Sequence, residues 1–151
     1  MSRIVLAIYR FGYIMHKLKI PILPKLIQYF IRLVFGPFIG MGAKFGKNVW
    51  LLSGGIGVVI NQKAVIGNNV IIHQNVTIGD DGKSLDAPMI EDNCKISAGA
   101  IVIGGIRVGK NSIIGANAVV NKDIPPNSIA VGVPAKVIKQ LKILKVTTNK
   151  I

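Results

Sequence analysis

The sequence is poor in the residues that most often carry redox, metal or acid–base chemistry. It contains one cysteine, Cys94, two histidines, His16 and His73, and six acidic residues against 19 lysines and arginines. A lone cysteine excludes an intramolecular disulfide, and we expect no metal site. Because no secretory signal peptide is visible, the expected compartment is the reducing cytoplasm.

Long hydrophobic runs are also missing, although half of the residues are hydrophobic. Cationic side chains interrupt the apolar N-terminal stretch before it reaches the 18 or more residues of a membrane span. These residues are Arg3, Arg10, Lys17, Lys19, Lys25 and Arg32. A transmembrane protein is therefore excluded.

Negative charge is absent from the first 79 residues, because the first acidic residue is Asp80. The formal net charge is +13, and both ends of the chain are purely basic. This pattern favours an anionic partner, such as a phosphorylated cofactor, an acidic polysaccharide or a membrane surface, unless the lysines are only solvated. No helix-turn-helix, zinc or aromatic-rich strand motif accompanies the charge, so we expect no nucleic acid partner.

Residues 1–40 predict two short helices that are separated by Pro21 and Pro24 and closed by Pro37, since proline interrupts helices. In the second helix, Lys25 and Arg32 share a polar stripe with Gln28, and nearly all other residues are apolar. The apolar face needs a partner. Two alternatives remain open: peripheral contact with the inner face of a membrane, or docking on the rest of the protein or a sister subunit.

From Phe45 onward, large aliphatic residues recur every six positions. They are Ile60, Ile66, Ile72, Ile78, Ile90, Ile96, Val102, Val108, Ile114 and Val120. A second column of mostly small residues follows four positions after each aliphatic. Six is three strand periods and no multiple of 3.6, so the repeat predicts strands rather than a helix.

Stacked hexads predict a solenoid that turns at glycine or asparagine corners. Three faces make a coil of about 18 residues, which would place Ile60, Ile78, Ile96 and Ile114 in one interior ladder. Because solenoid ends need caps, the basic tail from Lys136 predicts a capping helix. The expected organisation is therefore a leader over 1–40, a β-solenoid domain over 41–135 and a basic C-terminal helix or tail over 136–151.

Two segments carry a family resemblance: GVVINQKAVIGNNVIIHQNVTIG, and ISAGAIVIGGIRVGKNSIIGANAVVNKDIPPNSIAVGVPAKVIK. Together they resemble the serine acetyltransferase-like branch of the hexapeptide-repeat acyltransferases over about residues 43–140. The N-terminal stretch is similar to the lead of the polysaccharide-modifying members. The resemblance implies an all-β, left-handed parallel β-helix, a homotrimer, acetyl-CoA as co-substrate and active sites between neighbouring subunits.

The same resemblance implies a CoA site along the coil edges, where small residues let a pantetheine arm approach the backbone. The implied residues are Ser97, Ala98, Gly99, Gly115, Ala116, Gly132, Pro134 and Lys136. Arg107, Lys122 and Lys136 are candidates for binding the CoA phosphates, with solvated surface residues as the alternative.

Acyl transfer needs a base near the acceptor hydroxyl, and histidine suits this role at neutral pH. Ser53 and Gly54 stand where the family usually carries its catalytic histidine, and Ala87 stands where it carries a second one. His73 is predicted to point outward one coil away from Ser53. The candidate catalytic residues are therefore His73, Ser53 and Asp86 of the polar 79–88 loop.

The predicted function is acetyl-CoA-dependent O-acetylation of a sugar or polysaccharide-precursor hydroxyl, with His73 as the base. Alternatives are serine O-acetylation, or a degenerate β-helix that only binds acyl-CoA or assembles. In either case Cys94 belongs to the small inward column, which predicts a buried structural thiol rather than a nucleophile.

Overall fold

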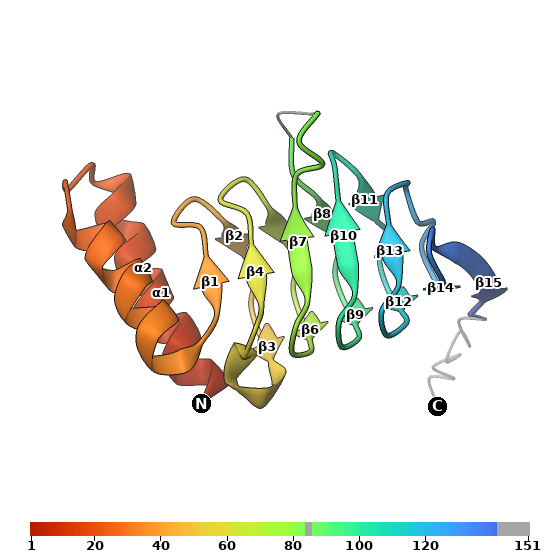
Figure 1. The fold of residues 1–151 in the computed structure, drawn as a ribbon, viewed down its shortest axis with the longest axis horizontal. Helices are drawn as coiled ribbons and strands as arrows, with labels where there is room; N and C mark the ends of the chain where they lie inside the picture. Colours follow the sequence, from red (N-terminus) through yellow and green to blue (C-terminus); the bar gives the residue numbers. More distant parts are fainter. Residues whose placement is uncertain (84–85, 142–151) are drawn as a thin grey trace, which may run out of the picture.

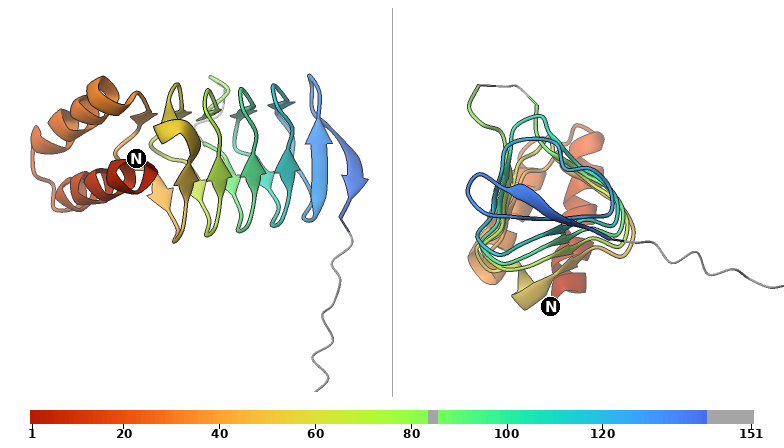
Figure 2. Two further views of the ribbon diagram at one scale, coloured as in Figure 1. Left: turned by 90° about the horizontal axis from the view of Figure 1, so that it is seen from below. Right: turned by 90° about the vertical axis from the view of Figure 1, so that its right-hand side faces the viewer.

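The repeat forms a three-sided, left-handed parallel β-solenoid with two helices at its N-terminal end (Figure 1). The structure, a computed structural model, describes residues 1–83 and 86–141. Viewed along the solenoid, the coils stack as a triangle (Figure 2). The aliphatic hexads are buried between the coils, as predicted, and each fully buried isoleucine contributes about 1.5–3 kcal/mol.

Each side of the triangle is a sheet of short strands. Sheet A contains β1 (Phe38–Ile39), β4 (Val59–Ile60), β7 (Thr77–Gly79), β10 (Ile101–Ile103) and β13 (Val119–Val120). Sheet B contains β2 (Lys44–Phe45), β5 (Val65–Ile66), β8 (Met89–Ile90) and β11 (Arg107–Val108). Sheet C contains β3 (Trp50–Leu51), β6 (Ile71–Ile72), β9 (Lys95–Ile96), β12 (Ile113–Ile114), β14 (Ser128–Val131) and β15 (Lys136–Gln140).

The predicted interior ladder is only half correct. Ile60 and Ile78 are partners in sheet A, but the next partner of Ile78 is Val102. Ile96 and Ile114 pair with each other in sheet C. The shift arises because the 79–88 loop adds residues to one coil, so constant spacing along the chain is lost there.

The corner between sheets B and C, called the B–C edge, is held by a ladder of asparagines. Each has a positive φ between 53° and 60°, and each amide bonds to the next at 2.7 to 3.2 Å. The ladder consists of Asn48, Asn69, Asn93, Asn111 and Asn127. Asparagine tolerates this left-handed conformation better than most residues, so one residue type supplies both the turn and the bond between coils.

Glycines beside these corners allow the backbones of adjacent coils to touch. A Cβ at Gly67 would lie 2.8 Å from the backbone nitrogen of Asp92, and one at Gly109 would lie 2.5 Å from that of Pro126. Neither glycine has a positive φ. Close approach, rather than turn geometry, therefore requires glycine at these positions.

The N-terminal residues form the two predicted helices, α1 (Ser2–Lys17) and α2 (Leu23–Phe35). The buried Tyr9 hydroxyl anchors α1, since it donates to the carbonyl oxygens of Gly40 at 2.9 Å and Ala43 at 2.8 Å. Only Pro24 and Ile31 of α2 are fully buried. Neither helix of the described chain is long and apolar enough to cross a bilayer.

The predicted C-terminal capping helix is wrong for the residues that can be assigned. Residues 136–140 form β15, which pairs antiparallel with β14 and is bonded through the Gln140 amide to the Ser128 hydroxyl at 3.1 Å. The outer edge of β14 presents unpaired backbone groups that a strand satisfies and a helix does not. Residues 142–151 of the predicted tail lie outside the described residues.

Candidate active site

The corner between sheets C and A, called the C–A edge, collects most of the predicted site residues. Successive coils contribute 52–58, 73–76, 97–100, 115–118 and 132–135 to it. Stacking is direct, because the Asn75 amide donates to Ile56 O at 2.9 Å and the Gly99 amide donates to Gln74 O at 3.1 Å. The predicted site residues on this edge are Ser53, His73, Ser97, Ala98, Gly99, Gly115, Ala116, Gly132 and Pro134, and β15 begins beside it with Lys136.

His73 follows β6 and is half-buried beside the turn of the preceding coil. Its backbone nitrogen donates to Ile96 O at 3.0 Å. Within the described chain, its Nε2 atom is buried and has no hydrogen-bond partner. The ring leaves the solenoid interior, as predicted, but it is less open to solvent than an outward side chain would be. An unpartnered buried nitrogen is uncommon in folded proteins and marks a group available to a ligand.

The surroundings of His73 favour its neutral form. Partial burial lowers the pKa of the imidazole below its ordinary value of 6.5, and the positive charge of Lys95 lowers it further. Lys95 occupies the next coil of sheet C, where it pairs with Ile71. A neutral imidazole at pH 7 can accept a proton, so His73 has the protonation state of a general base.

Ser53 lies in the irregular turn η1 (Leu52–Gly55), one coil before His73. Ser53 and Gly54 both adopt left-handed backbone conformations, at φ 54° and 70°. Ser53 is exposed, whereas Gly54 is buried with Met1 Sδ only 3.1 Å from the place that a Cβ would take. The turn therefore offers a hydroxyl at the surface and no group that can act as a base near pH 7.

The small residues of the C–A edge keep it narrow. Gly99 has φ 70°, and a Cβ there would overlap the side-chain oxygen of Asn117 in the next coil. At Gly115 a Cβ would lie 2.6 Å from Val131 Cγ1. These corners leave backbone amides and carbonyls close to the surface, which suits the pantetheine arm of CoA that the family resemblance implies.

Within one chain, Asp86 and His73 lie at different corners of the solenoid. Asp86 stands on the opposite border of sheet A, at the corner between sheets A and B, called the A–B edge, where it lines a pocket of about 390 Å³ with Ala87 and Arg107. Lys122 follows β13 on the same edge, away from the other predicted CoA residues. Arg107 forms an ion pair with Glu91 at 3.0 Å on sheet B.

The outer face of sheet A connects these two edges and is almost entirely apolar. One residue from each strand points outward in register. The row consists of Phe38, Val59, Thr77, Ile101 and Val119. Such a flat apolar row on one side of a solenoid is typical of a surface covered by another chain.

Cys94 is buried in the small inward column, as predicted. Its thiol donates to Gly109 O at 3.3 Å, and burial raises its pKa to about 11. A protonated, buried thiol is a poor nucleophile, so Cys94 is a core residue.

Two repeat patterns of known families match the chain. Residues 38–74 match the hexapeptide repeat of succinyl-transferase, and residues 87–122 match the bacterial transferase hexapeptide pattern of six repeats. Serine acetyltransferases match over more of the chain: that of Synechococcus elongatus is 36% identical over 135 residues, and that of Bacillus subtilis is 40% identical over 134. The chain belongs to the hexapeptide-repeat transferases.

Solved structures agree with this assignment. The serine acetyltransferase of Neisseria gonorrhoeae superposes with a TM-score of 0.87 at 34% identity, over 93% of this chain and 55% of that one. That of Brucella abortus, in complex with coenzyme A, gives 0.88 at 31% identity, over 92% of this chain and 56% of that one. The Synechococcus and Bacillus matches cover 88% and 87% of this chain, which spans only 55% and 61% of those relatives.

Sequence reasoning missed Lys95 as a neighbour of His73. The sequence did contain the information. If the 79–88 loop is left out and the hexads on its two sides are counted as continuous, β6 pairs with β9 and Lys95 points outward beside the coil of His73. Counting in steps of 18 residues leads from β6 to Met89 and Ile90 of β8, which lie in sheet B, instead of to Lys95 and Ile96 of β9.

Proposed function

We propose that the chain is an acetyl-CoA-dependent O-acetyltransferase with His73 as its general base. The observation that carries this proposal is the unpartnered, neutral imidazole on the edge where successive coils present their small residues. Support also comes from the similarity to serine acetyltransferases, one of which was solved in complex with coenzyme A. Ser97, Ala98, Gly99, Gly115 and Gly132 would flank the bound CoA.

The proposed reaction is a direct transfer. His73 Nε2 takes the proton of the acceptor hydroxyl, and the hydroxyl oxygen attacks the thioester carbonyl carbon. Backbone N–H groups of the C–A edge stabilise the oxyanion, the carbon–sulfur bond breaks, and the imidazolium returns its proton to the CoA thiolate.

We further propose that three chains share their sites as a cytoplasmic homotrimer. The apolar row of sheet A lies between the C–A edge and the A–B edge, so packing around this face would bring His73 of one chain toward the Asp86 loop of its neighbour. This arrangement gives Asp86 and Lys122 a place in the site that a single chain does not. Light scattering should give about three times the chain mass of 16.2 kDa.

Serine is the favoured acceptor, because the relatives that match most of the chain are named serine acetyltransferases. A sugar hydroxyl, which the sequence favoured, remains a second candidate. The observation that favours it is the exposed hydroxyl of Ser53 and the methyl of Ala87 where the family pattern has histidines.

Thiol release from acetyl-CoA, measured across serine and a panel of sugars, tests the function and names the acceptor. Release that depends on serine supports the favoured assignment. Release with a sugar alone moves the activity to the second candidate. No release with any acceptor would contradict an enzymatic role and favour a β-helix that binds acyl-CoA or only assembles.

The pH dependence provides a separate prediction about the base. Activity should fall as the pH drops through the lowered pKa of His73, since protonation removes the base. Lys95→Gln removes a neighbouring positive charge, so the acid limb of kcat/KM should move to higher pH. Lys44→Gln, on sheet B, is the control and should leave the limb in place. A limb that Lys95→Gln does not move would argue against His73 as the titrating group.

A further inference from the structure

The outer surface of α2 is an exposed apolar stripe. Leu26, Tyr29, Phe30 and Leu33 follow the spacing of one helical face, and all four side chains are more than half exposed. Leu33 is 87% exposed. The opposite face carries Ile31, which is buried, so the helix already packs against the protein with its other side.

Helix α1 repeats the pattern with a row of cations beside it. Ile4, Phe11, Ile14 and Leu18 form its exposed apolar stripe. Arg3, Arg10 and Lys17 recur every seven residues on the adjoining stripe and are exposed. The opposite face, with Val5, Tyr9 and Gly12, is buried.

The α2 stripe faces away from the solenoid, whereas Phe11 and Ile14 of the α1 stripe border an open pocket between α1 and the first coil. The helices pack together as a hairpin at the N-terminal end of the solenoid (Figure 1; Figure 2). A Cβ at Gly12 would lie 2.9 Å from Ile27 Cγ2 and 3.2 Å from Met41 Sδ, so the contact of the helices and their contact with the first coil lie on the same, inner side. The α2 stripe therefore belongs to the outer side of the hairpin, and the α1 stripe belongs to its flank beside the first coil.

The charge of the hairpin selects its partner. Residues 1–40 carry six cations, and no acidic residue occurs before Asp80. A second copy of the hairpin would bring like charges together at this face, whereas an anionic surface would neutralise them. Apolar stripes with flanking cations and aromatic rings are the composition of helices that lie in a membrane interface.

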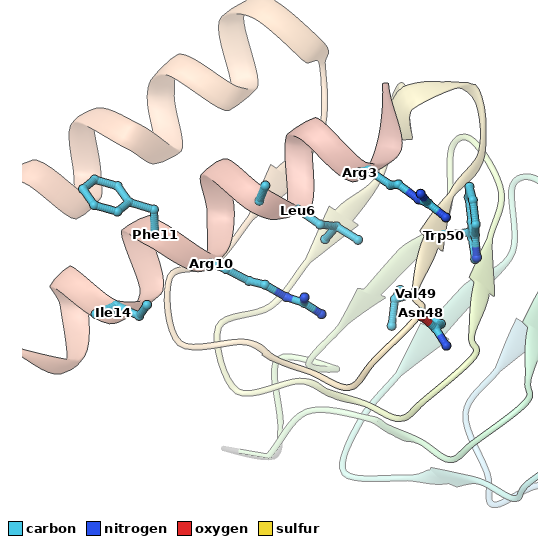
Figure 3. Close-up of a pocket in the computed structure, with 9 residues that line it drawn as sticks. Arg3, Leu6, Arg10, Phe11, Ile14, Asn48, Val49 and Trp50 are labelled. Carbon is cyan, nitrogen blue, oxygen red and sulfur yellow. The ribbon is translucent and has the colours of Figure 1, made fainter.

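A pocket beside α1 is bordered by two of these cations. It has a volume of about 590 Å³ and lies between α1 and the first coil, where Arg3 and Arg10 both reach across it (Figure 3). The Arg3 guanidinium stacks 5.1 Å above the ring of Trp50, while Arg10 donates to Gly46 O at 2.9 Å. Both arginines are fixed at the border of the apolar stripe.

We propose that α1 and α2 form a monotopic membrane anchor that binds the surface of an anionic bilayer. The apolar stripes enter the acyl boundary, and the cations Arg3, Arg10 and Lys17 contact lipid phosphates. The start of α1 packs against η1 of the C–A edge. None of the anchor residues belongs to that edge, so the anchor works whatever the acceptor is.

Sedimentation with vesicles tests the anchor on the full chain. The protein should bind phosphatidylcholine vesicles that contain phosphatidylglycerol more tightly than pure phosphatidylcholine vesicles, and salt should weaken the binding. Leu33→Glu should reduce the partition coefficient roughly ten-fold or more, because the bilayer loses contact with an exposed leucine and a negative charge is gained. Lys17→Gln should reduce it about five-fold.

Ile138→Glu is the matched control, since Ile138 is an exposed aliphatic in β15 at the far end of the solenoid. It should bind vesicles like the unaltered protein, and all three variants should keep the mass and circular dichroism of that protein. Equal binding to both vesicle types would overturn the proposal. So would a lipid-free assembly larger than a trimer that Leu33→Glu disperses, since the face would then bind a second copy.

Discussion

His73→Ala should lower kcat for acetyl transfer by about 100- to 10,000-fold, the range expected when a general base is removed. The KM for acetyl-CoA should change little, because the proposed CoA contacts come from other coils of the C–A edge. The acid limb of the pH profile should disappear with the imidazole. Thiol release at saturating acetyl-CoA, followed from pH 5 to pH 8 over the range where histidine titrates, provides the measurement.

His16→Ala is the control, because it removes the other histidine of the chain from the exposed end of α1. This variant should retain full activity. The free energy of unfolding should also depend on His73. Because the pKa of His73 is lowered in the folded protein, the folded state takes up the proton less readily than the unfolded state. The stability that His73 contributes is therefore present above the unfolded pKa of 6.5 and is lost as the pH falls through the folded pKa. Equal kcat values for His73→Ala and the unaltered protein would remove His73 from the mechanism.

Gly109→Ala should lower the free energy of unfolding by about 1–3 kcal/mol, the usual effect of an added methyl that has no space. The new Cβ would lie 2.5 Å from the backbone nitrogen of Pro126, so two coils would have to separate. A flexible side chain can rotate away from such a contact, but a proline backbone in the next coil cannot. Urea denaturation gives the difference directly.

Gly79→Ala is the matched comparison, because both glycines directly follow a buried aliphatic residue. At Gly79 the nearest atom to an added Cβ is Thr77 Cγ2 at 4.0 Å, and φ is not positive. This substitution should be neutral or stabilise by about 0.4–1 kcal/mol through the unfolded chain. A similar loss in the free energy of unfolding for both variants would show that the backbone preference of glycine, and not contact between coils, decides the effect.

The sequence was sufficient for the solenoid because each hexad carries its own signal. An aliphatic such as Ile72 or Ile90 must face inward whatever its neighbours do, and both are fully buried. The assignment of hexads to sheets was less secure, since one irregular segment changes the count for all later residues. The 79–88 loop had this effect and moved Ile96 from the predicted ladder to sheet C.

The asparagine ladder was not predicted for the same reason. Its members are separated by 21, 24, 18 and 16 residues, so no constant period reveals them. The candidate site shows a related limit. Sequence placed His73 beside Ser53, because both lie one coil apart in a regular stack, but the position of Asp86 across sheet A depends on the three-dimensional triangle.

The antiparallel pairing of β15 with β14 has a consequence for the solution behaviour of the protein. All the other strand pairs of the three sheets are parallel, so each coil presents an edge on which a further coil can stack. A terminal coil with such an open edge could stack on a second molecule and grow into a fibre. A strand that runs the opposite way breaks this template, and its lysines, Lys136 and Lys139, add repulsion at the exposed edge. With the helical hairpin at the other end, the solenoid is a rod of fixed length that resists end-to-end polymerisation.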